Sequence, residues 1–260
     1  MINEDNNKEL INESKLKFCV CFFGVISRSL DLTIKSINEN IFDVLADKKI
    51  KTDVYVHNMK VKKFKSIRSN ENTIIEDKID LLNSINCNKI FYSETKQSEF
   101  DENFNWKNSI KFGYLENNYN SHQNAIRQLF SVKQVTKMWE NKDINYDYYI
   151  YLRPDLLYIN KLNIEKIFDT LLYSNFLGTP FWHKWGGLND RIYMGCEKIM
   201  SIIGNRFDYL EEYINEKKIY HPETYFKYIV LKNNIKYIDI NLRGKRTRSN
   251  GHIVNENFRL

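Results

Sequence analysis

The stretch Tyr146-Asp-Tyr-Tyr-Ile-Tyr-Leu-Arg-Pro-Asp-Leu156 decides the fold expected for this chain. Its aromatic and β-branched residues favour a buried strand, and Pro154 cannot donate to a neighbouring strand, so we expect pairing to end there. Ligands of open α/β sheets bind just beyond the carboxyl ends of the strands. Arg153 and Asp155 therefore mark a candidate ligand site. A guanidinium beside a carboxylate at such a place suits a diphosphate, either bare or bound to a metal ion.

Apolar patterns on both sides of this strand predict an α/β fold. An apolar strand at 17–23 ends at Gly24, a helical pattern follows, and a second strand is expected at 52–56 with His57 at its end. A strand-helix-strand unit of this length predicts parallel strands joined by a right-handed crossover. Further elements are expected in this order: a strand at 89–92, a helix at 121–141, the strand described above, a helix at 163–172, strands at 175–182 and 192–194, helices near 196–203, 206–215 and 222–231, and a strand at 235–240. One domain with a mostly parallel central sheet flanked by helices is the simplest account.

For two stretches and for the cysteines, the sequence indicates the structure less clearly. Residues 60–88 are polar with a helical periodicity, and 93–120 are typical of a functional loop or lid. The four cysteines fit neither a zinc pattern nor a disulfide framework, so we expect buried thiols in a reducing compartment. From the alternation of side chains along a strand, we expect Cys19 and Cys21 to face opposite sides.

The charge is modest and unevenly distributed. The chain has 260 residues and a formal net charge of +6, yet residues 1–16 are rich in acids and residues 243–248 hold four bases and no acid. We expect a flexible tail at 1–16, a main domain at 17–242 and a basic C-terminal segment at 243–260. No RNA-binding motif or basic stripe appears, so nucleic acid is not an expected partner. Apolar runs are too short for a bilayer span, and the expected location is the cytoplasm, with contact to a membrane surface left open.

The order of these elements resembles a nucleotide-sugar-dependent glycosyltransferase of the GT-A fold, of the kind found in bacterial polysaccharide clusters and large DNA viruses. The residues that carry the resemblance are Phe22–Arg28, Asp53–His57, Tyr146–Asp155, Asn189–Arg191 in a glycine-rich loop, and His221–Glu223 at the start of a late helix. The resemblance implies a single-domain, Rossmann-like GT-A fold. It also implies transfer of a sugar from a nucleotide diphosphate sugar to a glycan or glycolipid hydroxyl. A single inverting displacement is the simplest mechanism, and retention is left open.

The resemblance gives the Arg153-Pro154-Asp155 element a specific role. Many GT-A enzymes carry Asp-any-Asp here and hold Mn²⁺ or Mg²⁺ on the donor diphosphate, whereas this chain has Arg153 in place of the first acid. Asp155 with phosphate oxygens could still hold a metal ion, with His221 as a second candidate ligand. Alternatively, Arg153 neutralises the diphosphate directly through paired hydrogen bonds. A third alternative is that Arg153 and Asp155 simply pair with each other.

Further residues are expected to contact the nucleotide or its diphosphate. They are Arg28, His57, Arg127, Arg243, Arg246 and Arg248. For each lone cation, a solvated surface side chain is the plain alternative. For His57 it is a structural histidine within the fold. The basic run could also contact an acidic lipid surface or a lipid-linked acceptor.

Sugar transfer with inversion needs a base that takes the acceptor proton. We assign this role to Asp190, with Glu223 as the competing candidate. Asp190 capping a turn or pairing with Arg191 is the alternative, and acids such as Glu223 also favour a first helical turn for electrostatic reasons alone. A sugar platform is expected from four residues of one loop: Trp182, His183, Trp185 and Asn189. The alternative is that these aromatic residues anchor the loop to the core.

Two other functions fit parts of the pattern. A non-catalytic nucleotide- or glycan-binding domain with a degenerate GT-A site is favoured by the missing first acid. A nucleic-acid-associated protein would use the basic C-terminal run, and its affinity would fall steeply with salt.

Overall fold

The computed structural model describes residues 16–67, 69–106, 120–171, 176–217 and 219–258. The expected flexible tail lies outside the described residues except for Leu16, and so does much of the expected lid. Within the described residues, no helix is long and apolar enough to cross a membrane.

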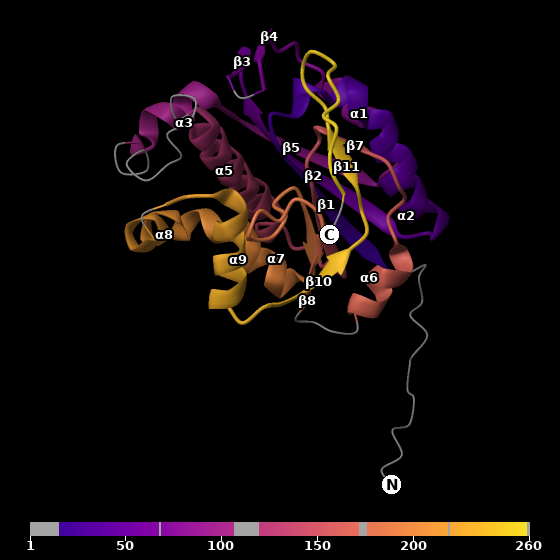
Figure 1. Cartoon of the computed structure of the whole chain (residues 1–260). Coiled ribbons are helices and arrows are strands. Elements are labelled where there is room, and N and C mark those ends of the chain that lie inside the picture. The colour runs from indigo at the N-terminus through magenta and orange to yellow at the C-terminus, as the bar shows by residue number, and fades with distance from the viewer. Residues whose placement is uncertain (1–15, 68, 107–119, 172–175, 218, 259–260) are drawn as a thin grey trace.

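A seven-stranded mixed sheet forms the centre of the described part of the chain (Figure 1). In spatial order its strands are β10 (Lys236–Ile240), β8 (Phe176–Pro180), β9 (Ile192–Gly195), β6 (Tyr148–Leu152), β1 (Lys17–Gly24), β2 (Lys51–Lys60) and β5 (Lys89–Lys96). β9 is antiparallel to both of its neighbours, and the other pairings in this sheet are parallel. The expected fold class, an α/β fold with a mostly parallel central sheet flanked by helices, is confirmed.

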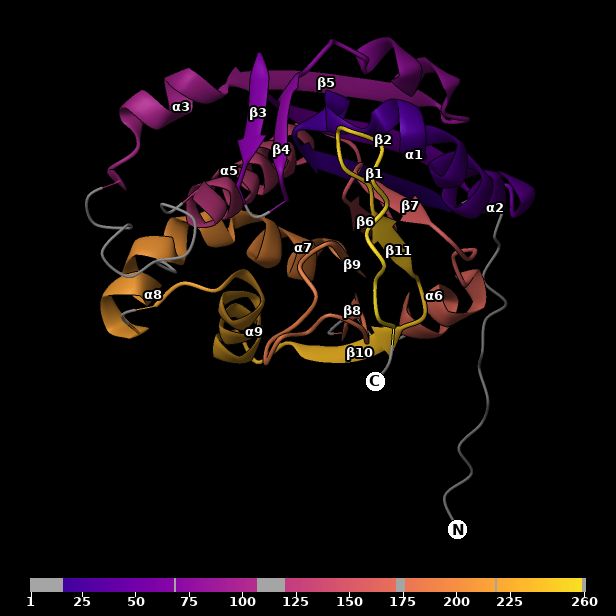
Figure 2. The same cartoon turned by 45° about the horizontal axis from the view of Figure 1, so that its top comes forward.

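Helices cover both faces of the sheet (Figures 1 and 2). One face carries α5 (Asn120–Glu140), α7 (Glu197–Gly204), α8 (Leu210–Lys217) and α9 (Pro222–Lys232). The other carries α1 (Leu30–Ile37), α2 (Asp43–Asp47) and α6 (Ile164–Leu171). The shorter helical segments are η2 (Ile26–Arg28), η3 (Asn38–Phe42), η4 (Ile79–Ser84), α3 (Gln97–Asn103) and η6 (Asn205–Tyr209). Because β1 is apolar on both sides, it joins the two cores, as expected for a strand inside a parallel sheet.

The expectation that Cys19 and Cys21 face opposite sides of the sheet is wrong. Cys19 and Cys21 are two positions apart on β1, so they share a face of the sheet. Their sulfur atoms lie 3.6 Å apart in the core beneath α5. None of the four cysteines, all of which are described, forms a disulfide.

Two small sheets complete the fold and were not expected. β3 (Lys63–Ser66) and β4 (Glu71–Ile74) form a hairpin where the sequence shows a helical periodicity. β11 (Gly244–Arg246) pairs antiparallel with β7 (Leu156–Tyr158), which begins directly after Asp155. The C-terminal segment therefore runs beside the end of β6. Figure 1 shows it continuing in yellow toward the β3–β4 hairpin, where the Ser249 amide and hydroxyl both donate to Glu71 at 3.0 Å.

Candidate functional site

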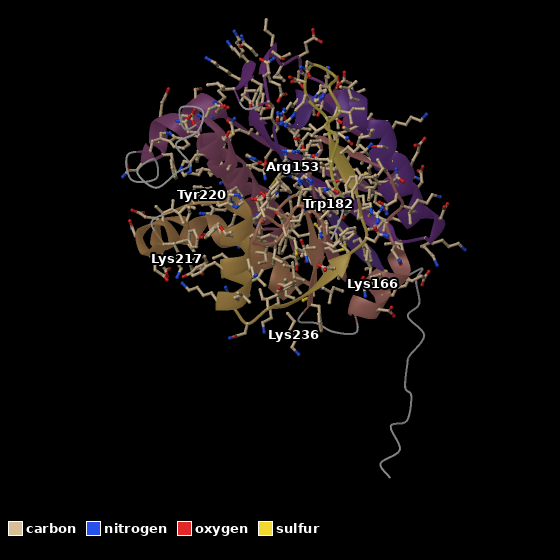
Figure 3. All side chains as sticks on the ribbon, in the orientation of Figure 1. Arg153, Lys166, Trp182, Lys217, Tyr220 and Lys236 are labelled. Atoms are coloured by element: carbon tan, nitrogen blue, oxygen red, sulfur yellow. The ribbon has the colours of Figure 1, made fainter. Side chains whose placement is uncertain are left out.

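The site lies at the point where the strand order reverses. β1 pairs with β2 on one side and with β6 on the other, so the chain segments that follow β1 and β6 leave a crevice between them. This is the place where open α/β sheets bind their ligands. Arg28 follows β1, and Arg153 and Asp155 follow β6. In Figure 3, Arg153 lies toward the middle of the molecule, whereas Lys217 and Lys236 lie near its rim.

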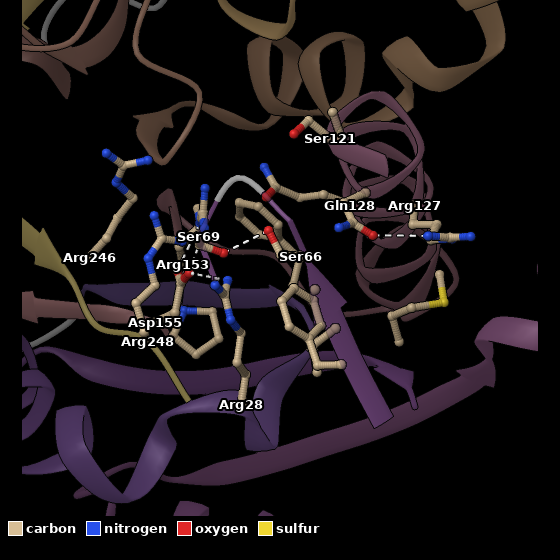
Figure 4. A pocket seen from close by; sticks show the side chains of 18 of the residues that line it. Arg28, Ser66, Ser69, Ser121, Arg127, Gln128, Arg153, Asp155, Arg246 and Arg248 are labelled. Atoms are coloured by element: carbon tan, nitrogen blue, oxygen red, sulfur yellow. Dashed lines mark hydrogen bonds and ion pairs between the residues drawn. The ribbon is translucent and has the colours of Figure 1, made fainter. Parts of the chain in front are cut away.

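A pocket of about 190 Å³ occupies this crevice, and we call it the cationic pocket (Figure 4). Its walls come from the segments after β1 and β6, the β3–β4 hairpin, the first turns of α5 and the segment that includes β11. Its charged lining residues are Arg28, Arg127, Arg153, Asp155, Arg246 and Arg248. The sequence-predicted diphosphate residues Arg28, Arg153, Asp155, Arg246 and Arg248 are thus brought together from distant parts of the chain.

Asp155 is the carboxylate at the centre of this group. Arg153 donates to it twice, from Nε to Oδ1 at 2.8 Å and from Nη2 to Oδ2 at 2.5 Å, and Arg28 donates from Nη1 to Oδ2 at 3.1 Å. Burial by itself would raise the pKa of Asp155, but the charges of Arg153 and Arg28 outweigh burial and hold this pKa well below its ordinary value. Asp155 is therefore ionised and serves to position two guanidinium groups.

A second buried carboxylate, Glu71 of β4, ties the hairpin to the same cluster. It forms ion pairs with Arg28 and, at 3.6 Å, with Arg248. Burial alone would raise the pKa of Glu71, but bonding to Arg28 lowers it on balance. Arg28 also lies over the ring of Phe64, 4.3 Å from its centre. Figure 4 shows Arg28 and Arg153 gathered around Asp155, with Gln128 and Arg127 of α5 on the opposite side.

The cationic pocket opens into a second pocket of about 380 Å³, which we call the carboxylate pocket. Ser121, Arg153 and Arg246 line both, so the two pockets form one cleft. The second part is lined by Asp190 and Glu223 and also by His122, Trp185, Arg191, Tyr220, His221 and Pro222. A cationic chamber thus adjoins a chamber with two carboxyl groups.

The antiparallel direction of β9 explains how Asp190 reaches this cleft. Ile192 at the start of β9 pairs with Leu152 at the end of β6, so the residues just before β9 lie beside the residues just after β6. The amide of Arg153 donates to the carbonyl of Arg191 at 3.1 Å. Gln128 of α5 donates to Asp190 Oδ2 at 3.4 Å.

Glu223 reaches the cleft in the first turn of α9, and Gly187 is what allows the close approach of its helix. A Cβ atom on Gly187 would lie 1.9 Å from the carbonyl oxygen of Glu223, so only glycine fits there. The same carbonyl accepts a hydrogen bond from the Leu188 amide at 3.0 Å. The loop before Asp190 is thereby fixed directly to the start of α9.

Glu223 has an unusual proton affinity for a carboxyl group. Its side chain is 10% exposed, and burial together with the nearby charge of Asp190 raises its pKa from 4.5 to about 8. His221 Nδ1 lies 3.3 Å from Glu223 Oε2. A carboxyl group with this pKa is mostly protonated at neutral pH.

Arg191 is a functional candidate that the sequence analysis did not select. It is only 5% exposed, lies over Trp182 at 5.4 Å from the ring, and its Nη1 has no hydrogen-bond partner among the described residues. Burial, followed by the charges of Arg246 and Arg153, lowers its pKa to about 10. A buried guanidinium in this state is stabilised by an incoming anion.

The residues around Asp155 do not fit a divalent metal ion. The two sequence-predicted ligands are split between the pockets, Asp155 in the cationic pocket and His221 in the carboxylate pocket. Both oxygens of Asp155 already accept bonds from guanidinium groups, whose charges would repel a cation. In the described part of the chain, no three His, Cys, Asp or Glu side chains gather into a metal-binding group.

Three other residues predicted at the donor site have different surroundings. His57 lies inside β2, which continues to Lys60, rather than at the strand end; its nitrogens contact Ser131 and Thr95 at 2.7 and 3.0 Å, and burial lowers its pKa to about 4. These contacts support a structural histidine. Arg127 lines the cationic pocket, but it makes paired bonds to Asp101 at 2.7 and 2.8 Å. Arg243 is not among the lining residues of either pocket, and it lies over the Phe181 ring.

The expected sugar platform separates into buried and exposed residues. Trp182 is fully buried and donates to the Leu242 carbonyl at 2.9 Å, so it offers no open face and its assignment is wrong for this structure. Asn189 is buried and donates to the Trp182 carbonyl at 2.8 Å. His183 bonds Glu256 at 3.0 Å. Trp185 is 61% exposed and lines the carboxylate pocket, which makes it the one of the four with a ring open to a sugar.

Two of the carboxylates that hold the arginines, Glu71 and Glu256, were not predicted from the sequence. Glu71 lies in a polar stretch without a recognisable strand pattern, and Glu256 lies after the last strand of the fold. Glu256 accepts from Arg246 Nε at 2.5 Å, and bonding to His183 and Arg246 outweighs burial and lowers its pKa to about 2. In the sequence, Glu71 and Glu256 are distinguished only as acids in chain segments that flank basic residues.

Comparison with known proteins gives a distant likeness to solved structures. No protein-family model matches the chain, and no curated protein matches it. Among solved structures, the chain is similar to the apo form of mouse xyloside xylosyltransferase 1, with 12% sequence identity and a TM-score of 0.47. The match covers 86% of this chain and 85% of that chain.

Proposed function

We propose that this chain is a glycosyltransferase that moves a sugar from a nucleotide diphosphate sugar to the hydroxyl of a glycan or glycolipid. The observation that carries the proposal is the two-part cleft at the switch point of the sheet. Arginines that suit a diphosphate line one part, and a carboxylate that suits a general base lines the other. A sugar ring that bridges the two parts would have its leaving group and its acceptor on opposite sides. The resemblance noted in the sequence agrees with this arrangement.

In the proposed reaction, the acceptor oxygen bonds to the anomeric carbon while Asp190 takes the acceptor proton. The bond between the anomeric carbon and the diphosphate oxygen breaks, and the diphosphate leaves with the electron pair. One displacement inverts the anomeric centre. Asp190 is the proposed base because Glu223, with a pKa of about 8, already carries a proton at neutral pH. Trp185 offers the acceptor sugar a face for stacking.

The leaving diphosphate would be held by the cationic pocket. Fixed guanidinium groups stabilise charge that develops on the leaving group, and they need no rearrangement during the reaction. In this proposal Arg246 and Arg248 bring the basic C-terminal segment over the donor, as part of the main domain rather than as a separate tail. The alternative role of the basic run, contact with an acidic lipid surface, is less favoured because both arginines are engaged by buried carboxylates.

The test combines calorimetric titration of nucleoside diphosphates with a donor-hydrolysis assay over a panel of nucleotide sugars. We expect at least one nucleoside diphosphate to bind and its sugar conjugates to be cleaved slowly by water. Asp190→Asn should abolish cleavage and retain binding, whereas Glu223→Gln should retain both. Binding without cleavage of any donor, with or without acceptor sugars, would instead favour a non-catalytic nucleotide-binding domain. If no nucleoside diphosphate binds, the proposed function is wrong.

A further inference from the structure

The arginine cluster of the cleft carries more positive charge than its carboxylates neutralise. Arg28, Arg153, Arg191, Arg246 and Arg248 influence one another's pKa or share partners, so they form one cluster. Among the residues that the structure describes, three carboxylates bond to them directly, namely Asp155, Glu71 and Glu256. Five guanidinium groups against three carboxylates leave an excess of two positive charges, or of one if Asp190 is also counted.

The arginine cluster leaves more net positive charge for an anionic ligand than a typical divalent metal site does. A divalent cation held by two carboxylates has no net charge left for its ligand, whereas the arginine cluster keeps a positive excess. The side chains are also held in place, because Arg28, Arg153, Arg246 and Arg248 are each at most 18% exposed. Fixed, partly dehydrated guanidinium groups bind phosphate oxygens through paired, charge-assisted hydrogen bonds.

Within the cluster, Arg191 has a guanidinium nitrogen that is available to bond an anionic ligand. Arg28, Arg153 and Arg246 are all engaged with carboxylates at 3.1 Å or less, while Arg191 Nη1 is buried without a hydrogen-bond partner in the described residues. Arg191 lines the carboxylate pocket, and its carbonyl accepts a hydrogen bond from the amide of Arg153, which lies at the junction because it lines both pockets. In the proposed reaction, this junction is where the bond between sugar and diphosphate breaks.

We infer that this cleft binds the donor diphosphate without a divalent metal ion, and that Arg191 supplies the guanidinium that contacts the phosphate next to the sugar. The inference rests on the proposed function, since it concerns the same site. Asp155, placed where a metal ligand would be expected, instead holds Arg153 and Arg28 in position for the diphosphate. The positive charge for the leaving group then comes from the chain itself.

The first experiment is calorimetric titration of the full chain with uridine, guanosine and adenosine diphosphates and with inorganic pyrophosphate, once in excess EDTA and once with Mn²⁺. We expect the affinity in EDTA to be within about threefold of the affinity with Mn²⁺. Binding that disappears in EDTA and returns with Mn²⁺ would overturn the inference and leave the proposed function standing. Absence of binding in both conditions would overturn the proposed function itself.

The second experiment separates Arg191 from its neighbours. Arg191→Gln should weaken diphosphate binding in EDTA by about 10- to 100-fold, the usual worth of a charge-assisted hydrogen bond. The diphosphate affinity of Arg191→Lys should lie between those of the wild type and Arg191→Gln, since lysine keeps the charge and loses the paired geometry. Lys184→Gln is the matched control, because it removes another cation from the same loop. Lys184 pairs with Asp239 and lines neither pocket. Wild-type affinity in Arg191→Gln, with an unchanged melting temperature, would show that Arg191 does not contact the phosphate.

Discussion

Replacing Glu223 with Gln should make the protein more stable at alkaline pH. An unfolded chain releases the Glu223 proton near the ordinary pKa of 4.5, whereas the folded protein holds it to about pH 8. Between these values folding takes up a proton, so the contribution of Glu223 to stability is fully present below about pH 4.5 and is lost as the pH rises through about 8. Gln has nearly the same shape and cannot ionise, so it removes this dependence.

The size of the effect follows from the two pKa values. A tenfold change in proton affinity corresponds to about 1.4 kcal/mol, so a rise from 4.5 to about 8 corresponds to roughly 4 to 5 kcal/mol above pH 8, and to roughly 3 kcal/mol at pH 7. For a chain of this length, each kcal/mol changes the melting temperature by about 2 to 4 °C. We therefore expect Glu223→Gln to melt several degrees above the wild type at neutral pH and further above it at pH 8.

The assay is a series of thermal melts from about pH 5 to about pH 9 on four proteins: wild type, Glu223→Gln, Asp190→Asn and the double variant. Burial is the largest cause of the raised pKa of Glu223, and the charge of Asp190 is the second. The stabilisation by Glu223→Gln should therefore be smaller, but still present, when Asp190 is already Asn. A melting-temperature difference that does not vary with pH would refute the reasoning, and so would a Gln variant that is less stable than the wild type at pH 8.

Three further predictions concern other parts of the cleft. Asp155→Asn should destabilise the fold by about 3 to 5 kcal/mol in urea unfolding, since it leaves the buried Arg153 and Arg28 without their shared carboxylate; an effect near zero would mean that these ion pairs do not form. Gly187→Ala should abolish donor cleavage while the circular dichroism spectrum stays close to that of the wild type, because the added methyl group displaces the Asp190 loop from α9; full activity would contradict the close contact. Trp185→Ala should raise KM for the acceptor and leave both the melting temperature and nucleoside diphosphate affinity unchanged; a large fall in melting temperature would instead place this ring in the packing of the loop.

The framework of the cleft could be predicted because its strands are apolar over their whole length. β1 and β6 are buried on both faces, and Pro154 ends the pairing of β6 where the sequence indicates. Pro222 likewise begins α9 at the expected position. These signals are local, since each depends on a few neighbouring residues, and together they fix which loops meet at the switch point.

The sequence suggests the pairing of Arg153 with Asp155 as one alternative, and the structure shows this pair. The other pairing partners of the arginines could not be predicted, because they depend on contacts between distant and polar segments. β3 and β4 have four residues each, and β7 and β11 have three each, too few for a period to be recognised. The sequence of the loop before β9 also cannot show which of its two tryptophans is buried. Trp182 can be buried because its indole nitrogen donates a hydrogen bond to the carbonyl of Leu242, which lies 60 positions away in the chain.

The antiparallel direction of β9 determines much of the proposed chemistry. A parallel strand in its place would bring the residues after it, not Asp190 and Arg191 before it, to the edge where β1 and β6 end. Because β9 runs the other way, Arg191 pairs with Arg153 through the backbone, and Asp190 lies in the same cleft as the diphosphate cluster. A base must lie near the anomeric carbon without pairing with the arginines that hold the leaving group. The reversed strand meets this requirement, since it places Asp190 in the carboxylate pocket, where Gln128 rather than an arginine donates a hydrogen bond to its side chain.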